Sequence, residues 1–242
     1  MSIQSDAQNI KCIGIIGAGA IGQALASQFI RAGIPVTISN RRGPDLLASL
    51  IEQLGPNAKA GTAQDAVAED IVVLAFPWDQ LESVAAGLPS LANKIVIDAV
   101  NPVLLPGYRL AELNGKSSSE VVSNFLPGAR LVKAFNTLLA AVLASDPGKD
   151  GGKRVVFVSS DDADAKMQVK DLIERLGFAV VDLGTLATGA KCSNFPAAHC
   201  LDLTWSNWVK RIYFLIRLGQ LHGQGELSIS VGKRIVARNQ PP

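Results

Sequence analysis

Residues 13–42, IGIIGAGAIGQALASQFIRAGIPVTISNRR, decide the fold of this chain. An apolar run, Ile13–Ile16, leads into a GxGxxG loop at residues 17–22, and apolar side chains then recur at helical spacing. A glycine and a proline end the helical pattern, and Val36–Ser39 has the composition of a second strand. A strand, a glycine loop, a helix and a strand in this order are typical of a dinucleotide-binding crossover.

Each glycine of the loop has a physical role in this interpretation. Gly17 permits a tight turn after the strand, Gly19 lets the backbone approach a pyrophosphate, and Gly22 leaves room where the helix meets the sheet. The pyrophosphate would bind the free N–H groups at the start of the helix. A glycine-rich turn that holds no ligand is the alternative. The candidate cofactor-binding residues of the loop are Gly17, Ala18, Gly19, Ala20, Ile21 and Gly22.

The turn after the second strand indicates which dinucleotide binds. NAD-binding proteins normally have Asp or Glu here, which accepts a hydrogen bond from the ribose 2′-hydroxyl. This chain instead has Ser39, Asn40, Arg41 and Arg42, with no carboxylate until Asp45. Guanidinium groups suit a 2′-phosphate, which they meet with paired, charge-assisted hydrogen bonds. The sequence therefore favours NADP over NAD, and a solvated basic turn is the alternative.

Composition excludes several classes of protein. The chain has 242 residues, of which 48% are hydrophobic, and a formal net charge of +2, values typical of a globular protein with a sizeable core. Its near-neutral charge gives no sign of a nucleic-acid partner. Three cysteines suggest no disulfide framework, and the first residues resemble no secretory signal or membrane span. We therefore expect a cytoplasmic protein with no membrane partner.

Further strand and helix patterns extend the crossover into a doubly wound, mostly parallel α/β sheet of the Rossmann NAD(P)-binding type, with a small C-terminal α/β extension. Apolar runs at 71–76, 94–98 and 130–135 are typical of strands buried on both faces. The carboxyl ends of such strands line the ligand crevice. The candidates for cofactor contact at these ends are Ala75, Phe76, Pro77, Asn101, Ala134, Phe135 and Asn136. Trp78 and Asn136 are the candidate positioning groups for catalysis.

The stretch 146–152, DPGKDGG, is a linker candidate because of its composition. It predicts an NADP-binding domain at 9–146 and a smaller domain at 153–242, which would close the acceptor pocket and contribute to a dimer interface. Asp161 and Asp162 precede a helical pattern and are expected to cap it. A long apolar-faced helix is expected at 201–221.

No nucleophile–base set is evident in the sequence. Cys192, His199 and Cys200 lack the fourth ligand that a zinc site needs, so we expect no metal. Hydride transfer between two cofactors depends on positioning and on exclusion of water more than on acid–base groups. The pattern thus favours an oxidoreductase that uses a small-molecule redox co-substrate.

Taken together, the segments resemble the family of coenzyme F420-dependent NADP oxidoreductases, which shares its nucleotide domain with membrane-bound ferric reductases of animals. The resemblance implies hydride exchange between NADP(H) and the 5-deazaflavin ring of coenzyme F420, in a homodimer. The nicotinamide would lie near Phe76, Pro77 and residues 134–136. The matching segments are residues 17–22, 39–42, 76–78, 98–102, 132–137, 161–162 with the helix that follows, 177–184 and 223–227.

The chain departs from that family at two places. Asn136 stands where the archaeal enzymes have a histidine, and residues 189–203 match their deazaflavin pocket poorly. Two alternatives therefore stay open. One is an NADPH-dependent reductase of another acceptor, such as a flavin, a quinone, ferric iron or a small imine or carbonyl. The other is a non-catalytic NADPH sensor.

Overall fold

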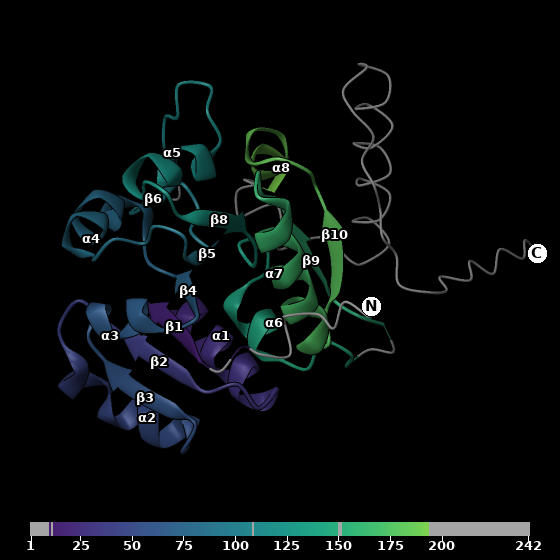
Figure 1. Ribbon diagram of the computed structural model, residues 1–242. Helices are drawn as coiled ribbons and strands as arrows, with labels where there is room; N and C mark the ends of the chain where they lie inside the picture. The colour runs from purple at the N-terminus through teal and green to yellow at the C-terminus, as the bar shows by residue number, and fades with distance from the viewer. Residues whose placement is uncertain (1–9, 11, 108, 150–151, 194–242) are drawn as a thin grey trace, which may run out of the picture.

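A parallel sheet forms the centre of the molecule (Figure 1). The computed structural model describes residues 10, 12–107, 109–149 and 152–193. The six-stranded sheet has the order β3-β2-β1-β4-β5-β8, and every neighbouring pair is parallel. Because the order reverses between β1 and β4, a topological switch point lies there. The strands are β1 Ile13–Ile16, β2 Val36–Ser39, β3 Ala58–Gly61, β4 Ile71–Leu74, β5 Ile95–Asp98 and β8 Arg130–Lys133.

Helices cover both faces of this sheet. Successive side chains of each strand point to opposite faces, and the apolar ones on both faces need to be buried. In β4, Ile71 and Val73 join the buried cluster that includes helix α1, whereas Val72 and Leu74 join the cluster on the opposite face. This arrangement confirms the predicted doubly wound α/β fold. The helices of this part are α1 Ala20–Arg31, α2 Ala48–Leu54, α3 Ala63–Ala68, α4 Leu81–Gly87, α5 Ser118–Phe125 and α6 Ala140–Ala144, with short 3₁₀ turns η2 Pro44–Leu47 and η3 Trp78–Gln80.

A second strand–helix–strand unit follows residue 152. It consists of β9 Val155–Val158, α7 Ala163–Arg175 and β10 Ala179–Asp182, with α8 Leu186–Ser193 after it, and β9 and β10 pair in parallel. An antiparallel bridge between Lys133 and Ser159 joins β9 to β8. The buried cluster on the α1 face continues into β9, α7 and β10. The hydrophobic core is therefore continuous between the parts of the chain before and after the candidate linker at residues 146–152. The division into two domains stays a prediction.

Three elements have no clear signal in the sequence. The pattern at residues 60–70 predicts only a loop and a short helix, yet β3 begins at Ala58 and pairs with β2. Its sequence, AKAG, has a low intrinsic preference for strands, so pairing at the sheet edge decides its conformation. The other two are the hairpin of β6 Val103–Leu104 with β7 Arg109–Leu110, and α8. The predicted helix at 201–221, and residues 199, 200 and 223–227, lie outside the described residues.

None of the helices in the described ranges combines the length and the apolar character that crossing a membrane requires.

A buried glutamine joins α1 to α6, which lie side by side in Figure 1. The amide of Gln28 donates to the carbonyls of Leu143 and Ser145, at 2.5 and 2.9 Å. Its oxygen accepts from the guanidinium of Arg31, which also donates to the carbonyl of Leu176. Gln28 is 1% exposed, so these carbonyls depend on it for partners inside the protein.

We expect Gln28→Ala to lower the free energy of unfolding by about 2–3 kcal/mol, because the substitution leaves buried carbonyls without donors. Urea unfolding followed by circular dichroism measures the change. Ser27→Ala is the matched control, since among the described residues the Ser27 hydroxyl donates only to the carbonyl of Gln23 within the same helix. The control should stay within about 0.5 kcal/mol of the wild type. Equal losses in both variants would contradict the assigned role of Gln28.

Candidate functional site

The glycine loop packs tightly at both ends and is open in the middle. A Cβ atom on Gly17, which has φ +112°, would lie 2.2 Å from the carbonyl oxygen of Ala75 at the end of β4. A Cβ atom on Gly22 would lie 1.9 Å from the carbonyl oxygen of Gly17. Gly19, the N-cap residue of α1, has no atom within 4 Å of its Cβ position. The loop thus leaves free space in front of the first N–H groups of α1, where a pyrophosphate fits.

A cavity of about 370 Å³ lies beside this loop. It brings together nine of the predicted residues: Gly17, Ala18, Gly19, Asn40, Arg41, Arg42, Ala75, Phe76 and Pro77. It also includes five residues that the sequence interpretation missed: Gln23, Leu46, Leu47, Leu50 and Gln80. The leucines follow Pro44 in the first turns after the basic segment, and helical spacing alone does not show that they face a ligand. The cavity has a basic end and an apolar wall, as a phosphorylated adenosine requires.

Local hydrogen bonds shape the basic turn. The side chain of Asn40 accepts from the backbone N–H of Arg42 at 2.9 Å, and Gly43 follows with φ +96°. Arg41 and Arg42 are both exposed, so their guanidinium groups are available to an anion. Ser39 is different, because its buried hydroxyl donates to the carbonyl of Ile15 and its side chain does not line the cavity.

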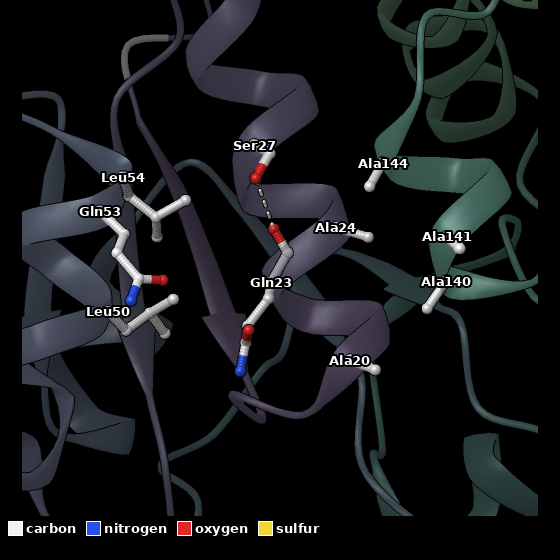
Figure 2. Close-up of a pocket in the computed structure, with 10 residues that line it drawn as sticks. All are labelled: Ala20, Gln23, Ala24, Ser27, Leu50, Gln53, Leu54, Ala140, Ala141 and Ala144. Carbon is white, nitrogen blue, oxygen red and sulfur yellow. Dashed lines mark hydrogen bonds between the residues drawn. The ribbon is translucent and has the colours of Figure 1, made fainter.

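A second cavity, of about 460 Å³, lies next to the first and shares Gln23 and Leu50 with it (Figure 2). Its walls come from α1, α2 and α6, and Ala20, a predicted cofactor residue, lines this cavity rather than the first. Figure 2 shows Gln23 between the α2 side chains and the alanines of α6. Its amide donates to the carbonyl of Ala18 at 2.8 Å. None of the described residues that line this second cavity is charged, so the first cavity is the candidate for a dinucleotide phosphate.

Two asparagines pair where β5 and β8 end. The Asn101 amide donates to the backbone carbonyl of Asn136 at 2.7 Å, and the Asn136 amide donates to the side-chain oxygen of Asn101 at 3.0 Å. The Asn136 amide also donates to the carbonyl of Ser193 at 3.0 Å. These two donor contacts fix which way the Asn136 amide points. Its oxygen, Oδ1, is buried and has no hydrogen-bond partner among the described residues.

The backbone of Phe135 turns the chain just before this pair. Phe135 has φ +64°, which is rare for a bulky side chain. Its ring lies in the core, edge-on to Phe29 and Phe178 with centroids 6.5 and 6.3 Å away. Ala134 is also fully buried. Of the three predicted residues at this strand end, Asn136 alone has a side chain that hydrogen-bonds at the carboxyl end of the strands (the ligand edge), and it is buried there and lines neither cavity.

The remaining predicted residues have structural surroundings. Trp78 is half-buried and packs against the cluster on the α5 face, and it does not line the first cavity. Ile21 is half-buried against the main core cluster. Asp162 caps α7 as predicted, accepting from the N–H of Ala165 at 2.8 Å, and Arg130 holds its pKa down at about 2. Across the described residues, no group of three or more His, Cys, Asp or Glu side chains could hold a metal ion.

Comparison with known proteins agrees with this geometry. Residues 12–102 match the model of the family described as NADP oxidoreductase, coenzyme F420-dependent. Residues 12–102 belong to this family. A hypothetical protein, SMa0349 of Sinorhizobium meliloti, is 46% identical, with a TM-score of 0.73 over 78% of this chain and 92% of that chain. A protein of Arthrobacter sp. FB24, proposed to be an F420-dependent NADP reductase, is 27% identical, with a TM-score of 0.66 over 93% of this chain and 100% of that chain.

The match places residues 12–102 in a family of NADP-dependent oxidoreductases. Another relative is metalloreductase STEAP3 of Rattus norvegicus, 28% identical over 185 residues, or 76% of this chain. The chain spans only 36% of the length of that metalloreductase. A reductive aminase of Aspergillus terreus, solved with NADPH and ethyl levulinate, is 20% identical with a TM-score of 0.55 over 88% of this chain and 66% of that chain, which shows the fold alone.

We expect the double variant Arg41→Ala with Arg42→Ala to weaken NADPH binding about 10- to 100-fold, because it removes charge-assisted hydrogen bonds to the 2′-phosphate. NADH lacks this phosphate, and its dissociation constant should change little. Fluorescence titration with each nucleotide gives both constants. Equal losses for the two nucleotides would contradict the assignment.

We expect Gly19→Ala to fold normally and to weaken NADPH binding about tenfold or more, because its methyl group enters space that the pyrophosphate needs. Gly87→Ala is the matched control, since its Cβ also meets no atom within 4 Å but lies at the end of α4, away from the cavity. Titration calorimetry compares the two variants. NADPH binding of wild-type strength in Gly19→Ala would place the pyrophosphate elsewhere.

Proposed function

We propose that this protein transfers a hydride between NADP(H) and the deazaflavin ring of coenzyme F420. The observation that carries the proposal is the buried oxygen of Asn136, an acceptor without a partner in the described part of the chain. Buried polar atoms are nearly always hydrogen-bonded, so an orphaned one at a ligand edge indicates a bound group with an N–H or O–H donor. Nicotinamide carries such a donor on its carboxamide, and deazaflavin on its ring lactam.

The order of the strands supports this arrangement. Arg41 and Arg42 follow β2 at one side of the switch point, and Asn101 and Asn136 follow β5 and β8 at the other. A dinucleotide bound across the glycine loop would therefore have its phosphorylated adenosine at the basic end. Its redox end would lie toward the asparagine pair. The protein's residues bind, orient and exclude water, while NADP supplies the hydride chemistry when it is bound.

Hydride transfer between two rings suits the groups at this edge. The asparagine side chains are neutral hydrogen-bonding groups that fix orientation without exchanging protons. The likeness to the Arthrobacter protein, which extends over the whole of that chain, favours F420 as the partner of NADP. The cytoplasmic location and the homodimer expected from the sequence remain parts of this proposal.

A second candidate is an NADPH-dependent reductase of a ferric or flavin acceptor. The observation that favours it is the match to the rat metalloreductase over 76% of this chain. Since only about a third of that protein is matched, the resemblance concerns that part alone and does not identify the acceptor.

NADPH oxidation followed by absorbance tests these candidates. The purified protein is mixed in turn with coenzyme F420, flavin mononucleotide, ferric citrate and a cyclic imine. Oxidation that depends on F420 supports the proposal. Oxidation with only one of the other acceptors replaces it with that activity, and tight NADPH binding without turnover indicates a sensor.

We expect Asn136→Ala to lower kcat about 5- to 30-fold, because it removes an orienting hydrogen bond worth about 1–2 kcal/mol in the transition state. Stopped-flow measurement of single-turnover hydride transfer isolates this step. Asn124→Ala, on the exposed surface of α5, is the matched control and should keep the wild-type rate. An Asn136→Ala enzyme with wild-type turnover would remove this residue from the site.

A further inference from the structure

A buried ion pair connects through the backbone of Val100 to the asparagine pair. Lys133 at the end of β8 and Asp98 at the end of β5 are both fully buried, with Lys133 Nζ 3.2 Å from Asp98 Oδ2. Burial lowers the pKa of Lys133, and the Asp98 carboxylate opposes that shift. A buried ion pair often contributes no more stability than apolar residues of the same size, because both charges lose their hydration. Its presence therefore calls for a role other than stability.

The pair holds one residue of the backbone from both sides. Asp98 Oδ1 accepts from the N–H of Val100 at 3.0 Å, and Lys133 Nζ donates to the carbonyl of Val100. The hydroxyl of Ser119, on α5, donates to Asp98 Oδ2 at 2.7 Å and orients the carboxylate. Val100 is itself buried, so its N–H and carbonyl depend on these side chains.

We propose that Lys133 and Asp98 are positioning residues that fix the backbone at Val100 and so hold Asn101 against Asn136 at the ligand edge. The chain of contacts is continuous, from the ion pair to Val100, from Val100 to the next residue, Asn101, and from Asn101 to Asn136. Apolar side chains could fill the same volume but could not hydrogen-bond both polar groups of Val100. The consequence for hydride transfer rests on the proposed function above.

The test uses a double variant, Lys133→Met with Asp98→Asn, which removes both charges at nearly constant volume. The asparagine keeps an acceptor for the N–H of Val100, and no unpaired charge remains buried. Ser119→Ala is a milder second variant, which removes one partner of Asp98 and leaves the ion pair. Arg130→Met is the matched control, because Arg130 lies on the same strand and pairs with Asp162 and Asp164, but at the end of β8 away from the ligand edge.

Two measurements separate positioning from stability. The first is hydrogen exchange of the side-chain amides of Asn101 and Asn136, observed by nitrogen-15 NMR and assigned with Asn101→Ala and Asn136→Ala. The second is kcat with the acceptor that supports turnover, alongside the dissociation constant of NADPH. In the double variant we expect the side-chain amides to exchange about tenfold faster or more, and kcat to fall by a similar factor. The affinity for NADPH should stay nearly unchanged. Ser119→Ala should show smaller changes in the same direction, and Arg130→Met neither.

Slow amide exchange together with wild-type kcat in the folded double variant would overturn the proposal. If the double variant does not fold, the same result in Ser119→Ala overturns it. Loss of NADPH affinity in proportion to kcat would also overturn it, because the pair would then support the whole binding site. Absence of turnover in the wild type with every acceptor would refute the proposed function alone, since amide exchange still reports on the positioning.

Discussion

The contact between Gly17 and the carbonyl of Ala75 sets the geometry on which the ligand edge depends. It brings the loop after β1 directly against the end of β4, at the point where the strand order reverses. Any side chain at Gly17 would push these two strand ends apart, because its Cβ would overlap a backbone oxygen that cannot move freely. The cavity beside the loop, and the direction in which α1 presents its N–H groups, follow from this close approach.

Charge is distributed unequally along this edge. The exposed guanidinium groups of Arg41 and Arg42 lie at one side, where solvent can exchange with an incoming phosphate. On the other side, Lys133 and Asp98 are buried, and their charges compensate each other within the protein. This arrangement lets charge determine which dinucleotide binds and lets hydrogen-bond geometry determine how a ring is held. Such separation suits a reaction in which the cofactors carry the redox chemistry.

The second strand–helix–strand unit takes part in the same construction. Its strand β9 bridges to β8 at Lys133, the residue whose side chain holds Val100, and its α8 ends at Ser193, whose carbonyl accepts from Asn136. The main hydrophobic cluster extends through both parts of the chain. Residues separated by a candidate linker in the sequence therefore support one group of side chains at the ligand edge.

Signals that act over a few residues were readable in the sequence. Three features of this kind are present in the structure: the order of β1, the glycine loop, α1 and β2, the basic turn in place of an acid, and the cap at Asp162. Each depends on near neighbours along the chain.

What only the tertiary structure decided depends on pairing across strands. The strand β3 forms because β2 offers a partner, and Phe135 turns inward because Phe29 and Phe178 leave room for its ring. The contacts of Lys133 with Asp98 and of Asn136 with Asn101 join residues 35 positions apart, and no local pattern reveals them. Burial and hydrogen bonding at those positions are properties of the assembled sheet, and the folded chain alone determines them.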